Sequence, residues 1–338
     1  MKPREGDLIE SVENVIFDVK GLVHPPGKVI AFPRFVPDVK GSRRHGALAF
    51  KKVYGLAERF EFLEKNFPGY VVYDAVFDEK LCEVPLENVK QVYSPINRLK
   101  QLRNSKTLDG LEAIALRCLK ILKEIANVPW NKMGISGSIL VKMHIRNSDI
   151  DPIVYGSENC WKVYYALQEL LRNGSTPFKS YTLKDLKVLF NFRSRDTAMS
   201  FEDFVAVEYR KVLQGKFMGK DYFIRFIKDI NEIDEKYGDV RFRNCGYARI
   251  EAVVVDNSEA IFTPCKYKIG NAKVVEGPKI KPIKEIASFR GRFCEQARKG
   301  ERVIAQGKVE KILDYKRNKE YFRLLLGNKP SDYMILKR

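Results

Sequence analysis

The sequence is poor in the residues that build thiolate and histidine metal sites. It contains three His and six Cys, and no two Cys form a Cys-x-x-Cys motif. A structural zinc site needs paired ligands at short spacing. We therefore expect the cysteines to be buried free thiols in a protein of a reducing compartment.

Long apolar segments are also lacking. No hydrophobic run approaches the ~20 residues that a membrane-spanning helix needs. The opening segment, MKPREGDLIESVEN, has neither the apolar core nor the small-residue cleavage site of a secretory signal. We expect a cytoplasmic protein with no membrane partner. Hydrophobic residues still form 45% of the 338 residues, so the chain can build the cores of about two or three domains.

Acidic residues are fewer than basic residues in this sequence. The chain has 61 Lys and Arg against 43 Asp and Glu, which gives a formal net charge of +18. The excess is greatest in residues 279–338, where 17 basic residues face 7 acidic ones. A surplus of this kind favours polyanionic partners such as RNA, DNA or nucleotide phosphates. The alternative is a basic surface that serves only solubility.

Strand and helix patterns alternate in blocks, which predicts a mixed α/β (α+β) protein. Residues 1–105 form a predicted β-rich N-terminal domain, whose polar and basic segment 88–106 is expected to be a linker. Residues 106–278 are predicted to be a central domain of mixed sheet and helices with a helical insertion at about 157–215. Residues 279–338 complete the chain as a predicted basic β-rich module.

An amphipathic helix is expected to open the central domain. Asp109 and Glu112 have the spacing of a capping box. One face of the helix is apolar and consists of Leu111, Ala115, Cys118, Leu122 and Ile125. The helix is expected to end before Pro129.

The most informative segment, residues 134–156, reads GISGSILVKMHIRNSDIDPIVYG. It places the turn Gly137-Ser138 at the start of a helix, and Asp149 and Asp151 at the start of a strand. Because alternate residues of a strand point to the same face, the two carboxylates should project together. Carboxylate oxygens suit Mg²⁺, and the backbone N–H groups of the turn suit phosphate. The alternative is a polar strand end with both acids solvated.

This order of Gly-Ser, short helix and Asp-x-Asp resembles the polymerase-β-type nucleotidyltransferase superfamily. In that superfamily the Gly-Ser contacts the triphosphate, the two acids bind two divalent metal ions, and a third acid from a later strand completes the metal site. The resemblance implies that Gly137 and Ser138 bind nucleotide. It also implies that Asp149 and Asp151 are catalytic residues that bind Mg²⁺ or Mn²⁺.

The resemblance is confined to residues 109–156 and is incomplete within them. The helix Ile139–His144 lacks the small or Arg-Gly residues that often follow the Gly-Ser. Pro152 stands where an apolar residue is usual, and proline is tolerated mainly in edge strands and bulges. Neither departure removes a chemical group that the reaction needs.

The third acid is expected in a later strand, residues 247–256, which reads YARIEAVVVD. Its more apolar face should pack against helices, which leaves Arg249 and Glu251 on the open face. We therefore expect Glu251 to be the third catalytic and metal-binding acid, with Asp256 as the alternative. A salt bridge with Arg249 or a neighbouring strand is the structural alternative for Glu251.

Together these features predict an enzyme that transfers a nucleoside monophosphate from an NTP to an acceptor hydroxyl and releases pyrophosphate. Nucleic acid is the expected acceptor, bound by the basic module through stacking and charge. The residues expected on this surface are Phe289, Arg290, Arg292, Phe293 and Lys308. The alternative function is a nucleic-acid-binding protein whose nucleotidyltransferase fold is catalytically idle. The sequence leaves the nucleotide, the acceptor and the oligomeric state open.

Overall fold

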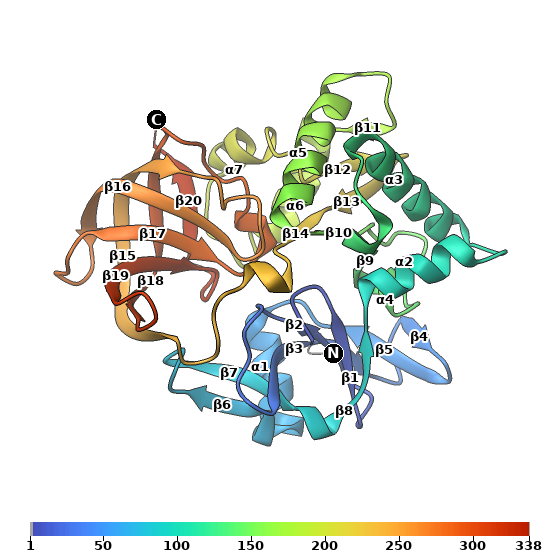
Figure 1. Ribbon diagram of the computed structural model, residues 1–338, viewed down its shortest axis with the longest axis horizontal. Helices are drawn as coiled ribbons and strands as arrows, with labels where there is room; N and C mark the ends of the chain where they lie inside the picture. Colours follow the sequence, from blue (N-terminus) through green and yellow to red (C-terminus); the bar gives the residue numbers. More distant parts are fainter. Residues whose placement is uncertain (1–2, 338) are drawn as a thin grey trace. The chain divides into compact units, whose positions relative to one another are not determined.

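A computed structural model describes residues 3–337 and confirms a mixed α/β protein (Figure 1). The helices are α1 (Leu56–Asn66), α2 (Pro95–Asn104), α3 (Gly110–Ala126), α4 (Gly137–Leu140), α5 (Ser157–Arg172), α6 (Leu183–Arg193) and α7 (Phe201–Glu208). None of the helices within this range is both long and apolar enough to cross a membrane.

The chain divides into two compact units. The N-terminal unit consists of the residues up to 72, 81–180 and 212–234, and the C-terminal unit of 73–80, 181–211 and the residues from 235 onward. The strands up to β14 lie mainly in the first unit and the strands from β15 onward in the second.

In the N-terminal unit, one sheet has the strand order β4-β5-β3-β2-β1-β8, and a hairpin of β6 and β7 joins it at β3. Its strands are β1 (Leu8–Ser11), β2 (Ile16–Val19), β3 (Lys28–Pro37), β4 (Arg43–His45), β5 (Leu48–Lys52), β6 (Val71–Asp74), β7 (Glu79–Pro85) and β8 (Val89–Tyr93). The early residues are therefore β-rich, as the β-branched and aromatic runs predicted.

The prediction of a linker at residues 88–106 was wrong, because this segment forms β8 and α2. Pro95 starts α2 after the N-cap Ser94, and the helix buries Leu99 and Leu102. Arg98 is also buried, with its Nε donating to the Ile139 carbonyl at 2.9 Å. In a sequence an arginine suggests a surface position, so the burial of Arg98 and the helix α2 were not predicted.

The helix predicted to open the central domain is confirmed as α3. Asp109 is its N-cap, and Glu112 closes the capping box by accepting from the Asp109 backbone N–H. The helix ends at Ala126, followed by Asn127 in the left-handed conformation (φ +48°). Leu111, Ala115, Cys118 and Leu122 of its predicted apolar face are buried, as the periodicity predicted, whereas Ile125 is 54% exposed.

Two small sheets complete the N-terminal unit, with the strand orders β14-β10-β9 and β11-β12-β13. Their strands are β9 (Met133–Ile135), β10 (Pro152–Tyr155), β11 (Phe178–Lys179), β12 (Gln214–Phe217), β13 (Lys220–Phe223) and β14 (Arg225–Ile227). Pro152 is the first residue of β10, a position at which proline does not interrupt the ladder.

The C-terminal unit contains a barrel. Its strands are β15 (Val240–Asp256), β16 (Cys265–Glu276), β17 (Ile283–Ser288), β18 (Arg302–Asp314), β19 (Lys319–Leu326) and β20 (Tyr333–Leu336). They follow the order β15-β16-β17-β19-β18, and β18 pairs again with β15, which closes five strands into a ring. All neighbours in this ring are antiparallel except β17 and β19.

The barrel does not follow the expected boundary at residue 278. Because β15 pairs with both β16 and β18, residues 240–276 share one sheet with residues 283–336. The basic C-terminal residues are thus part of a larger barrel rather than a separate meander.

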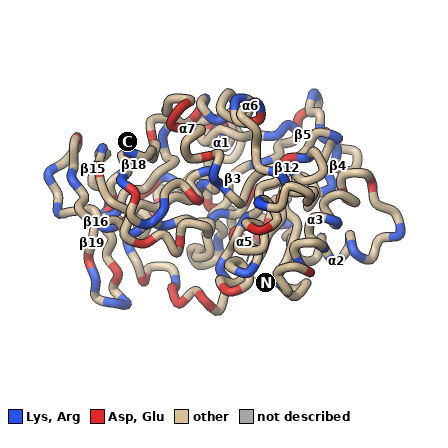
Figure 2. Tube along the Cα trace, turned by 90° about the horizontal axis from the view of Figure 1, so that it is seen from above, with Lys and Arg blue, Asp and Glu red and all other residues tan. Residues whose placement is uncertain are grey.

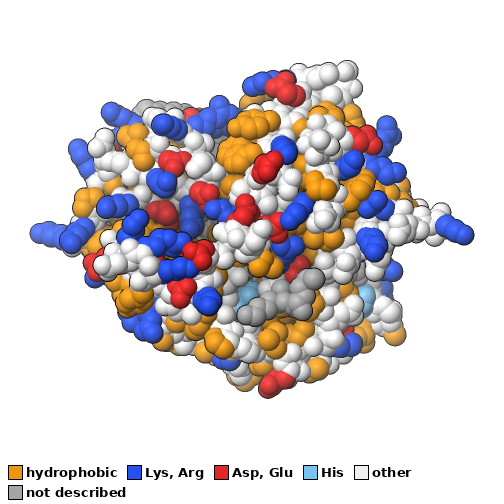
Figure 3. All heavy atoms as spheres, in the orientation of Figure 1, with side chains coloured by type: hydrophobic (Ala, Val, Ile, Leu, Met, Phe, Trp, Pro, Cys, Tyr) orange, Lys and Arg blue, Asp and Glu red, His pale blue; other side chains and the backbone are white. Residues whose placement is uncertain are grey.

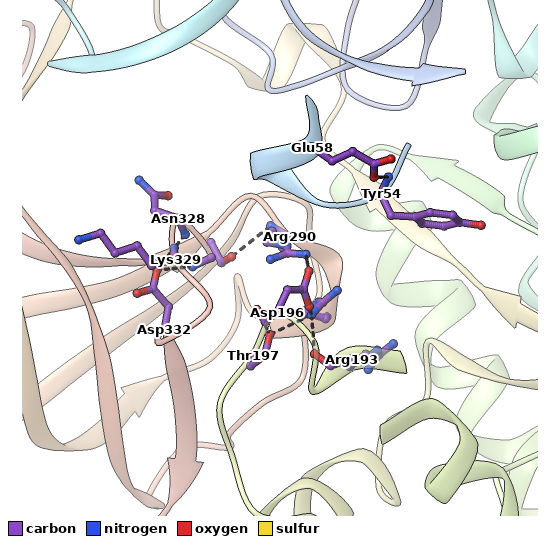
Figure 4. Close-up of polar contacts among 12 residues, drawn as sticks. Tyr54, Glu58, Arg193, Asp196, Thr197, Arg290, Asn328, Lys329 and Asp332 are labelled. Atoms are coloured by element: carbon purple, nitrogen blue, oxygen red, sulfur yellow. Dashed lines mark hydrogen bonds and ion pairs between the residues drawn. The ribbon is translucent and has the colours of Figure 1, made fainter. Parts of the chain in front are cut away.

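Of the residues expected on a basic surface of this module, Phe293 and Lys308 are buried, which corrects the prediction for them, whereas Phe289, Arg290 and Arg292 are half-buried. Asp196 accepts from the guanidinium groups of both arginines, and Figure 4 shows its contact with Arg290. Phe293 is 1% exposed and packs in the core. Lys308 is also 1% exposed and pairs with Glu310 at 3.1 Å as well as with Glu79. The sequence did not reveal that Arg290 and Arg292 are paired, because Asp196 lies 94 and 96 residues away from them in the chain.

Candidate active site

The Gly-Ser turn and the first acids lie on two adjacent strands. β9 and β10 are antiparallel, with Ile135 opposite Pro152. Ser136 continues this ladder by donating its N–H to the Asp151 carbonyl at 2.8 Å. The chain then turns sharply into α4, so the residue after Ser136, Gly137, is held against Asp151.

Gly137 and Asp151 are in direct contact. Gly137 has a φ of +62°, and a Cβ built on it would lie 1.9 Å from the Asp151 Oδ2 atom. Only glycine combines this conformation with so close an approach. The structure therefore brings together the predicted nucleotide-binding turn and a predicted metal-binding carboxylate. Ser138, the second residue of the turn, is buried.

α4 itself is a single turn of four residues. So few aligned peptides make a weak macrodipole, and any anion binding here depends on the individual backbone N–H groups of the first turn. We therefore expect phosphate binding to depend on the backbone N–H groups of this turn and not on a helix dipole.

A third carboxylate comes from β13. Ile150 and Tyr222 form a parallel bridge, in which the Ile150 N–H donates to the Asp221 carbonyl at 2.9 Å. Both bridged side chains are buried. Because neighbouring residues of an extended strand point to opposite faces, Asp149, Asp151 and Asp221 all project from the other face.

Electrostatics agrees with this grouping. Removal from bulk water and the negative charges of Asp151 and Asp221 raise the pKa of Asp149 to about 6, against the opposing charges of Lys52 and Arg34. Asp149 is nevertheless an exposed residue, so an ion can reach its carboxylate from solvent. Carboxylate oxygens suit a hard divalent cation, but the oxygens of these three acids do not all lie within 4.8 Å of one another, and Asp221 pairs with Lys216 at 3.2 Å.

Asp151 also borders a buried ion-pair network. Arg225, on β14, pairs with Glu5 at 2.9 Å, and Asp151 and Asp18 are among the charges that raise the pKa of Arg225. Asp18 in turn has a pKa held well below its usual range by Lys20 and Arg225, in spite of its burial. The network anchors the strand that follows the acids.

The two acids proposed from the sequence as the third ligand belong to the other unit, and their assignment stays a prediction. Glu251 and Asp256 are on β15 of the C-terminal unit, where Glu251 pairs with Lys337 at 2.5 Å and Asp256 with Lys268 at 2.9 Å. Asp221, in the same unit as Asp149 and Asp151, was not considered. Asp221 is the second residue of β13, and its proposed role depends on the pairing of Tyr222 with Ile150.

A second trio of potential ligands surrounds the start of α3. Asp109, Glu112 and His144 place one ligand atom each within 4.8 Å of one another. All three already have partners, since Asp109 caps α3 and accepts from His144 at 2.6 Å, and Glu112 pairs with Arg98. We interpret this trio as a helix cap with a docked histidine.

The chain is similar to a curated protein from an archaeon. The uncharacterized protein MJ1086 of Methanocaldococcus jannaschii is 32% identical over 359 aligned positions, which cover the whole of both chains. No family model matches the chain, and no solved structure matches it.

The contact of Gly137 with Asp151 leads to a prediction. Gly137→Ala should displace the Asp151 carboxylate and weaken divalent-ion and NTP binding by at least about tenfold, because an Oδ2 atom occupies the place of the new methyl group. Binding is measured by calorimetric titration. Gly27→Ala is the matched control, since Gly27 has a φ of +73° and nothing within 4 Å of its Cβ position. Equal effects of the two variants would show that backbone strain alone is responsible.

The raised pKa of Asp149 leads to a second prediction. Its ionised form costs stability above pH 6, so without divalent ions Asp149→Asn should raise Tm at pH 7 by roughly 1–3 °C, and this gain should vanish as the pH falls towards 4. Mg²⁺ should stabilise the unmutated protein, less so below pH 6 where Asp149 is protonated, and should not stabilise the variant.

Thermal unfolding from pH 4 to 8, with and without Mg²⁺, measures both effects. Asp109→Asn is the control, because asparagine keeps the helix cap and removes a charge from the second trio. Loss of the Mg²⁺ effect in this variant, with its retention in Asp149→Asn, would place the ion at α3.

Proposed function

The chain belongs to the same family as MJ1086, and we propose that it is a metal-dependent nucleotidyltransferase that moves a nucleoside monophosphate from an NTP to an acceptor hydroxyl. The single observation that carries the proposal is the placement of Asp221 on the same face as Asp149 and Asp151, beside the turn at Gly137. Three carboxylates next to a close-approach glycine match the requirements of phosphoryl transfer.

In this proposal Asp149, Asp151 and Asp221 hold Mg²⁺ or Mn²⁺, and the turn at Gly137-Ser138 receives the phosphates. Bound metal ions would supply charge neutralisation of the phosphates and activation of the acceptor hydroxyl. The acceptor oxygen forms a bond to the α-phosphorus, the bond from that phosphorus to the β-phosphate oxygen breaks, and the hydroxyl proton passes to solvent. Because Gly137 carries no side chain, the Asp151 carboxylate can lie directly against the turn.

The alternative is a nucleic-acid-binding protein with an idle transferase fold. An idle site would be free to lose the third acid or the glycine. The raised pKa of Asp149 shows that the fold tolerates an unfavourable crowding of negative charge at this place. Such crowding is typical of a site that binds cations, which supports an active enzyme.

The barrel supports a nucleic acid as acceptor. A five-stranded barrel with the order 1-2-3-5-4, in which strands 3 and 5 are parallel, has the strand order of the oligonucleotide- and oligosaccharide-binding fold, which binds ligands over strands 2 and 3 and adjoining loops. Here strands 2 and 3 are β16 and β17, which carry Lys266 and the exposed Lys284. The loop after β18 adds Tyr315, which is 61% exposed. Figure 3 shows basic side chains spread over the visible face of the barrel.

The transferase proposal is tested with purified protein, each labelled NTP, Mg²⁺, and RNA or DNA oligonucleotides. Label should move to an acceptor, and Asp149→Asn, Asp151→Asn and Asp221→Asn should each reduce the rate at least about a hundredfold. Glu251→Gln, at the acid first proposed, should retain the rate. Activity that depends on Glu251 and survives the loss of Asp221 would assign the third position to Glu251.

The acceptor surface is tested by nucleic-acid binding at several salt concentrations. Replacing Lys266 and Lys284 with Ala should weaken binding of single-stranded RNA or DNA and reduce the slope of log affinity against log salt by roughly 1.4, at about 0.7 for each phosphate contact. Tyr315→Ala should weaken binding with the slope unchanged, since stacking releases no counterions. Lys162→Ala, at a lysine paired with Glu158 on α5, is the control. An unchanged slope in the double variant would contradict this surface.

A further inference from the structure

One face of the N-terminal sheet is turned towards the Gly-Ser turn. Phe35 of β3 and Phe50 of β5 share a buried core cluster with Leu140 and Val141, which directly follow the turn at Gly137-Ser138. Lys52 is paired with Phe35 in the antiparallel ladder of β5 and β3. Because paired residues of an antiparallel ladder share a face, Lys52 lies on the side of the sheet that packs against α4.

Arg34 reaches the same region through an irregularity of β3. Ile16 pairs with Phe35, whereas the next residue, Phe17, pairs with Pro33, so Arg34 is the extra residue of a β-bulge. A bulge interrupts the alternation of faces and redirects the side chain that it carries. The Arg34 guanidinium donates to the Val53 carbonyl at 3.4 Å, which directs it towards the end of β5.

Both cations come from the part of the sheet that packs against the residues directly after the Gly-Ser turn. The charges of Lys52 and Arg34 both lower the pKa of Asp149, against the effects of burial and of the other acids. Figure 2 shows Lys and Arg positions along β3 and β5, the strands that contribute this pair. The acids are thus flanked by positive charge from a sheet that precedes the motif by about a hundred residues in the sequence.

Neither cation is used in an ion pair within the described residues. Both lie over the ring of Tyr54, whose centroid lies 5.0 Å from the Arg34 guanidinium carbon and 4.8 Å from the Lys52 Nζ atom. Tyr54 is 45% exposed, and its backbone N–H donates to Glu58 at 3.4 Å (Figure 4). The neighbouring Lys51, by contrast, is paired with Glu58 at 2.9 Å.

We propose that Arg34 and Lys52, positioned by Tyr54, bind the β- and γ-phosphates of the NTP and the pyrophosphate that is released. This assignment rests on the proposed function. It assigns the β- and γ-phosphates of the substrate to the N-terminal sheet. Two uncommitted cations facing an acidic cluster supply the charge that a polyphosphate requires. The guanidinium can bind phosphate oxygens in a bidentate manner, and the ammonium acts as a point charge. Both would stabilise the negative charge that develops on the leaving pyrophosphate.

The probe that isolates this subsite is inorganic tripolyphosphate with Mg²⁺, because it has no nucleoside. The double variant Arg34→Ala/Lys52→Ala should bind it at least about tenfold more weakly than the unmutated protein in calorimetric titration. Lys51→Ala removes a neighbouring charge from the other face of β5. This variant should bind tripolyphosphate with an affinity within about twofold of that of the unmutated protein. Retention of the Mg²⁺-dependent rise in Tm in the double variant shows that the fold and the carboxylates are intact.

Nucleotide transfer separates the two proposals. If the unmutated protein transfers nucleotides and the double variant does so with unchanged KM and kcat, the phosphate subsite is wrong and the function stands. If no transfer occurs with any NTP, but tripolyphosphate binding still depends on Arg34 and Lys52, the function is wrong and a polyphosphate site stands. Tripolyphosphate binding that is equal in all three proteins overturns the subsite. Arg34→Lys should restore part of the affinity, since it keeps the charge and loses the bidentate geometry.

Discussion

The contact between Gly137 and Asp151 is the constraint on which the site depends. No side chain fits between the turn and the carboxylate, because a Cβ at this position would lie 1.9 Å from an Asp151 oxygen. The ladder of β9 and β10 holds the two residues in this contact through the bond from Ser136 to the Asp151 carbonyl. This backbone arrangement would therefore place a phosphate bound to the turn next to a cation bound to the carboxylate.

The bridge between Ile150 and Tyr222 extends this arrangement to a third acid, at an electrostatic cost. Each carboxylate added to the face makes ionisation of the others less favourable, as the pKa of about 6 for Asp149 shows. The cost is partly offset by Arg34 and Lys52, which come from the N-terminal sheet. The sheet thus complements the charge of the site as well as packing against α4.

Local sequence patterns predicted the parts of the site that are local. The Gly-Ser turn, the strand-opening acids and the capping box at Asp109 follow from short-range spacing, and the structure places the first two in contact. Asp221 could not be found in this way, because its role depends on which strand lies beside Ile150. The choice of Glu251 applied the correct rule of alternating faces to a strand that belongs to the barrel. A single sequence contains no information on such pairings, and so the third acid and the barrel boundary were out of reach.

Net charge was the least direct guide to function, because it counts cations that the fold has already neutralised. Arg290 and Arg292 share Asp196, and Lys308 is buried between two glutamates, so the most basic segment of the chain offers fewer free charges than its composition indicates. The cations that could bind a nucleotide are those that have no ion-pair partner and lie beside the proposed metal-binding carboxylates. Arg34 and Lys52 meet this condition beside the carboxylates. A basic composition therefore becomes evidence for a phosphate ligand only after each cation has been assigned its partner.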